Sequence, residues 1–187
     1  MHIKNTYKKV PYYKPNINLG QQIVNSKGQK KIALPKFVLK KIKNELFARL
    51  AYNCPISSWR IKLHRARGVN IGNNVHIGRR VTLDNAYPEY IYLEDNVSLS
   101  GDNYILAHSI PYEHFKNFLG SYVAPVIIKK GAWVAIMATV LPGVTIGKNA
   151  IIGAGVVVNK NVPDSAIVTL NKNKVIIPKN LNSCLNS

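Results

Sequence analysis

The chain has 187 residues, enough for one domain and an appendage, and 47% of them are hydrophobic, which is sufficient for a packed core. It carries 26 Lys and Arg residues against 8 Asp and Glu residues, so its formal net charge is +18. This composition excludes global disorder. No stretch approaches the ~20 apolar residues of a membrane span. The excess positive charge points to an anionic partner.

The N-terminal residues 1–30 are polar and have no clear period, so we expect an arm that lies extended on a neighbouring surface. They contain no apolar run of the kind that marks a signal peptide. Cys54 and Cys184 are far apart and lack metal-ligand spacing. We therefore expect both thiols to be reduced, which suits a cytoplasmic protein.

Residues 35–67 have a helical pattern. Apolar residues recur near helical spacing between residues 37 and 51, with lysines on the other face. Pro35 suits a helix start, and Asn53-Cys54-Pro55 predicts its end. Ser57-Ser58 are expected to cap a second short helix, which Gly68 closes.

The same segment holds most of the clustered charge. Between Lys30 and Arg67 there are eleven Lys and Arg residues and one acid, Glu45. The chain has no zinc-finger spacing, recognition helix or aromatic RNA motif, so nucleic acid is not the expected partner. Two interpretations stay open for this basic stretch: a solvated face packed on its own domain, or a face for a membrane surface or an anionic glycan.

From Val69 onward, aliphatic residues recur every six positions, a period that fits neither a helix nor a long alternating strand. From Ile128 to Val158 the residue four places after each aliphatic one is small or β-branched, and Val75, Val81 and Val97 follow the same rule in earlier hexads. The residue directly after the aliphatic one is often glycine or short and polar, which supports a turn. Three such hexads close a triangular coil, and stacked coils bury their aliphatic residues against one another. The repeated positions are Ile71, Ile77 and Leu83; Leu93, Leu99 and Ile105; and Ile128, Val134, Val140, Ile146, Ile152 and Val158.

The repeat breaks twice. Leu83 and Leu93 are ten residues apart, which predicts a small bulge at residues 85–89. Ile105 and Ile128 are twenty-three apart, which predicts an extruded loop over residues 107–125. Loops on a rigid scaffold are common places for binding and catalytic residues.

Three segments resemble the hexapeptide-repeat acyltransferases of the maltose and galactoside acetyltransferase type and the related O-acetyltransferases of capsule and lipopolysaccharide synthesis. They are VIIKKGAWV (126–134), VLPGVTIG (140–147) and IGAGVVVNKNVP (152–163). The resemblance implies a mainly β fold, a left-handed parallel β-helix over residues 68–177. A basic, partly helical extension (1–67) would precede it and a tail (178–187) would follow.

The resemblance also implies transfer of an acetyl group from acetyl-CoA to a hydroxyl of a sugar or glycan. His108, just before the extruded loop, matches the family's general base, and an imidazole suits proton removal near neutral pH. A backbone N–H near Ala135 or Ile136 is the expected donor to the developing oxyanion. Glu113 is a candidate to orient His108.

Matched positions also suggest where the two substrates bind. The acetyl-CoA positions are Ile136, Ala154, Asn159, Lys160 and Lys174, with the lysines facing CoA phosphates. Asp84 resembles a carboxylate that orients sugar hydroxyls, although a corner-turn role stays open. Trp133 is expected to pack at a coil edge or between subunits.

Family members often form homotrimers with the site between subunits, so we expect a homotrimer. We expect it in the cytoplasm, where association of the basic region with the inner face of the membrane stays open as an alternative to a solvated face. Two other functions stay open. A γ-carbonic-anhydrase-like enzyme would hold zinc through His76, His108 and His114. A non-catalytic scaffold would use the prism only to present the basic region. Zinc analysis and acetyl-CoA binding distinguish these possibilities.

Overall fold

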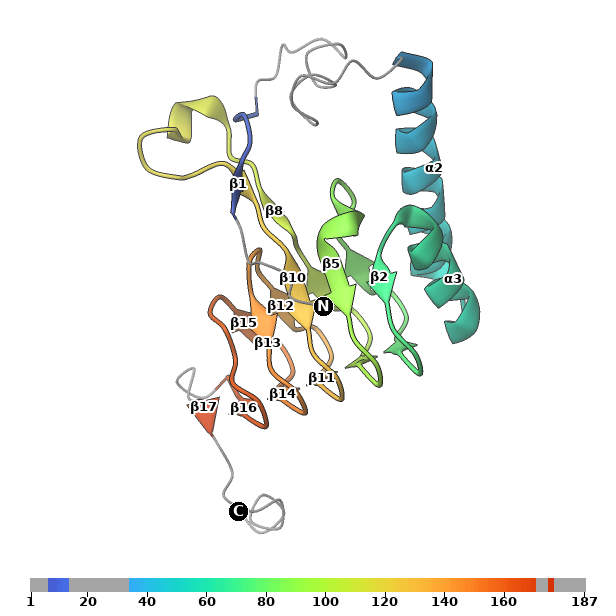
Figure 1. Cartoon of the computed structure of the whole chain (residues 1–187), viewed down its shortest axis with the longest axis vertical. Helices are drawn as coiled ribbons and strands as arrows, with labels where there is room; N and C mark the ends of the chain where they lie inside the picture. The colour runs from blue at the N-terminus through green and yellow to red at the C-terminus, as the bar shows by residue number, and fades with distance from the viewer. Residues whose placement is uncertain (1–6, 14–33, 171–174, 177–187) are drawn as a thin grey trace.

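A computed structural model describes residues 7–13, 34–170 and 175–176, and most of these build a prism of stacked triangular coils (Figure 1). Each coil contributes one short strand to each of three faces. In chain order the strands are β2 (Asn70–Ile71), β3 (His76–Ile77) and β4 (Thr82–Leu83); β5 (Ile91–Leu93), β6 (Ser98–Leu99) and β7 (Tyr104–Ile105); β10 (Val126–Ile128), β11 (Trp133–Val134) and β12 (Thr139–Val140); β13 (Thr145–Ile146), β14 (Ile151–Ile152) and β15 (Val157–Val158); and β16 (Ile167–Val168).

Equivalent strands of successive coils pair in parallel, which confirms the six-residue repeat. The faces have the orders β2-β5-β10-β13, β3-β6-β11-β14-β16 and β4-β7-β12-β15, and β17 (Val175–Ile176) extends the second face antiparallel to β16. The strand register aligns each aliphatic position with the next, so that Leu93 pairs with Ile128 and Ile128 with Ile146. The predicted repeat positions therefore form ladders along the prism.

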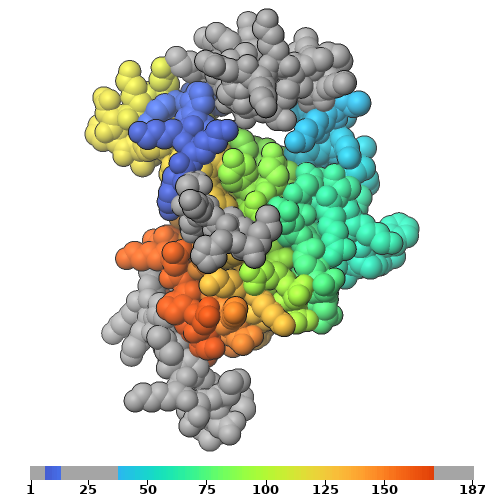
Figure 2. All heavy atoms as spheres, viewed as in Figure 1, coloured from blue at the N-terminus to red at the C-terminus, as the bar shows by residue number. Residues whose placement is uncertain are grey.

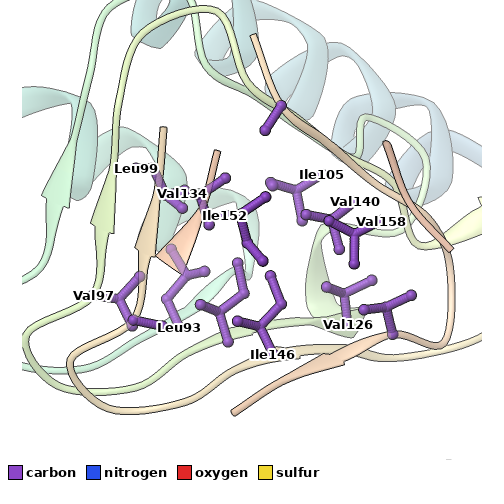
Figure 3. Packing of buried hydrophobic residues seen from close by; sticks show 14 of the residues in the cluster. Leu93, Val97, Leu99, Ile105, Val126, Val134, Val140, Ile146, Ile152 and Val158 are labelled. Carbon is purple, nitrogen blue, oxygen red and sulfur yellow. The ribbon is translucent and has the colours of Figure 1, made fainter. Parts of the chain in front are cut away.

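The core is the inside of the prism. The repeated Ile, Leu and Val residues point inward from the three faces and are almost all buried, as Figure 3 shows for Leu99, Val134 and Ile152 on one face. The small residues four places later, such as Ala132, Ala138 and Ala150, are fully buried beside them. Burial of this aliphatic column is the main term that stabilises the coils.

Glycine at the corners does not have the role in turn conformation that the sequence predicted. Positive φ angles occur three places after most of the aliphatic positions, for example at Asn74 (50°) and Asn96 (58°), and not at the glycines one place after them. Those glycines are needed for close approach. A Cβ on Gly78 would lie 2.5 Å from the carbonyl carbon of Ser100 in the next coil. Stacking of coils, more than turn conformation, accounts for glycine at this position.

Both predicted breaks are present. The first contains a 3₁₀ turn, η1 (Pro88–Tyr90). The second projects from the prism as β8 (His108–Ser109), η2 (Glu113–Phe115) and β9 (Tyr122–Val123). The N-terminal strand β1 (Lys8–Lys9) pairs with β9, so the described part of the arm lies on the chain's own extruded loop (Figure 1).

Two helices close the end of the prism that begins with β2 (Figure 1). They are α2 (Leu34–Asn53) and α3 (Ser57–Arg67), with the break where it was predicted. Gly68 ends α3 with a left-handed φ of 105°, as expected, but the N-cap is Ile56 and no side-chain cap is present. Among the described helices, none has the length and apolarity needed to cross a membrane.

Arginines of α3 donate hydrogen bonds to backbone carbonyls at the open edge of the first coil. Strands β2, β3 and β4 are edge strands, and an uncovered edge leaves carbonyl groups unpaired. Arg65 donates to the carbonyl of Gly72 (2.7 Å), Arg60 to that of Ile77 (2.8 Å) and Arg67 to that of Leu83 (3.0 Å). One arginine thus reaches each face of the prism, and part of the basic charge serves to cap the fold.

Candidate active site

Pairing of β4 with β7 brings two polar residues together at one corner of the prism. Leu83 lies opposite Ile105 in this pair. Asp84 follows β4 directly, and His108 begins β8, three residues after β7 ends. The Nδ1 atom of His108 therefore lies 2.6 Å from Oδ2 of Asp84, although the residues are 24 positions apart in the sequence.

The Asp84 carboxylate is fully buried, and both of its oxygens are hydrogen-bonded. Oδ1 accepts from the backbone N–H groups of Ala86 (2.8 Å) and Tyr87 (2.9 Å). Oδ2 accepts from the N–H of Ala107 (2.7 Å) as well as from His108. Burial alone would raise the pKa of Asp84, but the hydrogen bond and charge of His108, with those backbone donors, outweigh it and hold the pKa below its ordinary value. Asp84 is therefore ionised at neutral pH.

An ionised carboxylate can only accept hydrogen bonds, so it fixes the tautomer of His108. Nδ1 carries the proton that faces Asp84, and Nε2 keeps the lone pair. The imidazole is partly exposed, with 32% of its side-chain surface accessible, and its ring lies 5.6 Å from that of Tyr87. The arrangement presents an oriented base at the surface of the prism.

Arg67 holds the turn that carries Asp84. Its Nη2 donates to the carbonyls of Leu83 (3.0 Å) and Asp84 (2.9 Å) and to Oδ1 of Asn85 (3.0 Å). Burial lowers the pKa of Arg67 to about 10, against the opposing charges of Asp84 and Glu45, so it stays protonated at neutral pH. The sequence interpretation treated Arg67 only as part of a basic face. Its position just before the first coil is the one sequence feature that distinguishes Arg67 from the other basic residues of this region.

The expected cofactor positions lie on two different edges of the prism. Ile136 and Ala154 occupy the corner between the second and third faces, in successive coils, and the N–H of Gly155 donates to the carbonyl of Ile136 (2.9 Å). Asn159 and Lys160 follow β15 and lie on the edge that also carries Asp84 and His108. All four side chains are exposed.

The two candidate oxyanion donors differ in availability. The N–H of Ala135 is bonded to the carbonyl of Ile152 (2.8 Å), so it is occupied within the sheet ladder. Among the described residues, no backbone carbonyl accepts a hydrogen bond from the N–H of Ile136. Ile136 therefore stays the better of the two candidates.

The remaining predicted residues are placed apart from the Asp84–His108 pair or lie outside the described structure. Lys174 lies outside the described residues. The carboxylate that contacts the His108 ring is that of Asp84, not that of Glu113. Trp133 is half exposed and donates to Ser100 Oγ (3.0 Å). Within the described part of the chain, no three His, Cys, Asp or Glu side chains group in a way that could hold a metal ion.

Comparison with known proteins identifies the repeat. Residues 125–160 match the bacterial transferase hexapeptide family (six repeats). The six-residue repeat of this segment is similar to that of this family. It begins where the extruded loop rejoins the prism and ends at Lys160, so it covers β10 to β15.

A curated relative extends the match beyond the hexapeptide segment. An Escherichia coli K12 protein named as a colanic acid biosynthesis acetyltransferase, WcaF, is 32% identical over 114 residues. The match covers 51% of this chain and 62% of that protein. The chain therefore spans less than two thirds of the relative's length.

Solved structures share the fold that carries the hexapeptide segment. A maltose O-acetyltransferase from Clostridium difficile 630 is similar with a TM-score of 0.59 and 24% identity, over 76% of this chain and 87% of that one. A galactoside acetyltransferase in complex with coenzyme A is similar with a TM-score of 0.56 and 19% identity, over 90% and 94%. The expected fold, a left-handed parallel β-helix, is confirmed.

Proposed function

We propose that the chain is an acetyl-CoA-dependent O-acetyltransferase that acts on a hydroxyl group of a sugar or glycan. The observation that carries this proposal is the pair of Asp84 and His108, 2.6 Å apart, with the aspartate buried and the histidine at the surface. An oriented imidazole is the group needed to activate a hydroxyl, which is a weak nucleophile while protonated. The likeness to WcaF supports the same reaction class.

In the proposed reaction, His108 Nε2 takes the proton of the acceptor hydroxyl as its oxygen attacks the thioester carbonyl carbon of acetyl-CoA. A C–O bond forms, the carbonyl oxygen becomes an oxyanion, and the C–S bond then breaks. The CoA thiolate leaves and takes the proton from the imidazolium. Asp84 stabilises the transient imidazolium by its charge and keeps the ring in the productive tautomer.

In this proposal Asp84 is a positioning residue and not the sugar ligand that the sequence suggested. Its carboxylate accepts four hydrogen bonds from its own chain and has no exposed surface, so it has no oxygen to offer a sugar hydroxyl. A carboxylate or amide side chain that binds the sugar hydroxyls would have to come from another residue. The acceptor class, a sugar, is supported by relatives named for colanic acid, maltose and galactoside.

The two-edge arrangement supports a homotrimer with the site between copies. His108, Asn159 and Lys160 lie on one edge of the prism, whereas Ile136 and Ala154 lie on another. In a closed ring of three copies every interface is heterologous, so it brings unlike edges together. Acetyl-CoA would then lie between prisms, with the Ile136 N–H toward the oxyanion and Lys160 toward a phosphate. We expect this assembly in the cytoplasm.

Two measurements test the proposal on the intact chain. Titration calorimetry with acetyl-CoA should detect binding at micromolar to millimolar cofactor, and a thiol-release assay with a panel of sugars and nucleotide sugars should identify an acceptor. Absence of cofactor binding would favour a non-catalytic scaffold. Stoichiometric zinc in the purified protein would favour the carbonic-anhydrase-like alternative.

A further inference from the structure

Helix α2 has two apolar stripes on opposite sides. One stripe, around Ala48 and Ala51, is buried against the rest of the chain. The other consists of Leu39, Ile42, Leu46 and Leu50, whose spacing of three and four residues aligns them along one face. At 3.6 residues per turn, the centres of the two stripes are about 180° apart. We call the second stripe the outer face of α2.

The outer face is exposed over its whole length. Leu39 is 68% exposed, Ile42 58%, Leu46 51% and Leu50 49%. Four large aliphatic side chains in a row over three turns, about 16 Å of helix, form a contiguous apolar strip and not scattered surface residues. In Figures 1 and 2, α2 runs along the outside of the molecule at the end of the prism.

The outer face is continuous with a groove of about 660 Å³ beside the helix. Ile42 and Leu46 form its helical wall, and Asn85 and Ala86 form the opposite wall. This groove extends the apolar surface toward the turn that carries Asp84. The apolar area is therefore larger than the helix stripe alone.

Basic side chains cover much of the rest of the helix, and two of them, Lys43 and Arg49, flank the outer face. The described turns of α2 contain Lys40, Lys41, Lys43 and Arg49, all exposed, and one acid, Glu45. Glu45 is paired with Arg49 at 2.8 Å, and the Lys40 ammonium lies 3.9 Å from the carboxylate of Glu89. The four basic side chains therefore exceed the carboxylates that pair with them. The neighbouring arginines of α3 donate to carbonyls of the first coil, and the Lys43 ammonium lies 5.5 Å from the centre of the Phe47 ring.

We propose that the outer face of α2 docks on the surface of an anionic lipid bilayer. A helix with an apolar strip flanked by basic side chains lies in the interface plane, with its aliphatic side chains among the acyl chains and its basic groups at the anionic headgroups. A second copy of the chain is a poorer occupant, because packing two outer faces together would bring their lysines into contact. The proposal is independent of the acetyl transfer chemistry.

Co-sedimentation of the full chain with vesicles tests the proposal. Binding to vesicles with anionic lipid is expected to exceed binding to neutral vesicles by tenfold or more, and to decline as salt screens the lysines. Leu46→Gln should lower the partition constant about fivefold to tenfold, and the combined Leu39→Gln, Ile42→Gln and Leu46→Gln variant should abolish binding. Leu170→Gln, at a leucine that is 63% exposed on the prism, is the matched control and should bind normally.

A charge-matched pair of variants separates local from global electrostatics. Lys43→Gln should weaken binding about fivefold, because a lysine near the surface is worth about fivefold. Lys148→Gln changes the net charge equally and should have a much smaller effect. Equal binding by the outer-face variants and the wild type would overturn the proposal. A change of oligomeric mass in those variants, without a change in vesicle binding, would assign the surface to a second copy instead.

Discussion

Replacement of Asp84 by asparagine probes how the candidate base is held. The carboxylate accepts four hydrogen bonds, from the N–H groups of Ala86, Tyr87 and Ala107 and from Nδ1 of His108. An asparagine keeps one acceptor oxygen and puts an NH₂ group in place of the other. If the NH₂ faces His108, the imidazole must present its Nδ1 lone pair, and the proton then moves to Nε2. The base loses the lone pair that the reaction uses.

The magnitude follows from the same geometry. A wrong tautomer in the analogous Ser-His-Asp arrangement lowers kcat about 10⁴-fold, and we expect a loss of about 10³- to 10⁴-fold in Asp84→Asn. In that orientation the NH₂ also faces the N–H of Ala107 and leaves this buried donor unpaired, whereas the opposite orientation would leave the donors of both Ala86 and Tyr87 unpaired. At about 1–3 kcal/mol for an unpaired buried donor, the free energy of unfolding should fall by roughly 1–3 kcal/mol.

Steady-state thiol release gives kcat and KM for this variant, and calorimetry gives its affinity for acetyl-CoA. The loss should appear in kcat, with cofactor affinity nearly unchanged, and thermal unfolding should report the loss of stability. Asp102→Asn is the control, because Asp102 is also paired, with Arg80 at 2.6 Å, but at a different corner. A kcat for Asp84→Asn within threefold of the wild type would refute the role assigned to Asp84.

Three further predictions concern stability. Burial, with the charges of Arg67 and Arg60, lowers the pKa of His64 to about 3, whereas the unfolded chain takes up this proton near pH 6.5. The free energy of unfolding should therefore fall by about 1.4 kcal/mol for each unit by which the pH is lowered from 6 to 3. In denaturant titrations at several pH values, His64→Gln should flatten this slope, whereas the control His76→Gln should not. Arg67→Met removes the donor to two carbonyls and should cost about 2–4 kcal/mol; a change below 0.5 kcal/mol would show that these carbonyls find other partners. Gly78→Ala should destabilise the prism by about 1–3 kcal/mol, because its Cβ meets the backbone of the next coil, whereas Gly120→Ala should be nearly neutral.

The prism could be predicted because its signal is local. An aliphatic side chain that points inward recurs at every sixth residue within each run of coils. The observed strand register aligns these positions from Ile71 to Ile146 without a shift. The breaks in the repeat also located the extruded loop. The role of glycine was misassigned because a period shows where a corner lies, but not which residue meets the adjacent coil.

The site was only partly predictable. His108 was found by resemblance and by its place at a break, but its partner depends on the pairing of β4 with β7, which closes a separation of 24 residues. The role of the basic helices was also hidden. Arg60, Arg65 and Arg67 look like surface charge in the sequence, and only their contacts with edge carbonyls reveal them as caps.

The most direct test of the central claim is the rate of acetyl transfer by His108→Ala with saturating acetyl-CoA and an accepted sugar. The account predicts that transfer is abolished, while the affinity for acetyl-CoA and the unfolding temperature stay close to those of the wild type. Near-normal turnover by this variant would contradict His108 as the general base. It would also remove the reason for Asp84 to be buried beside it.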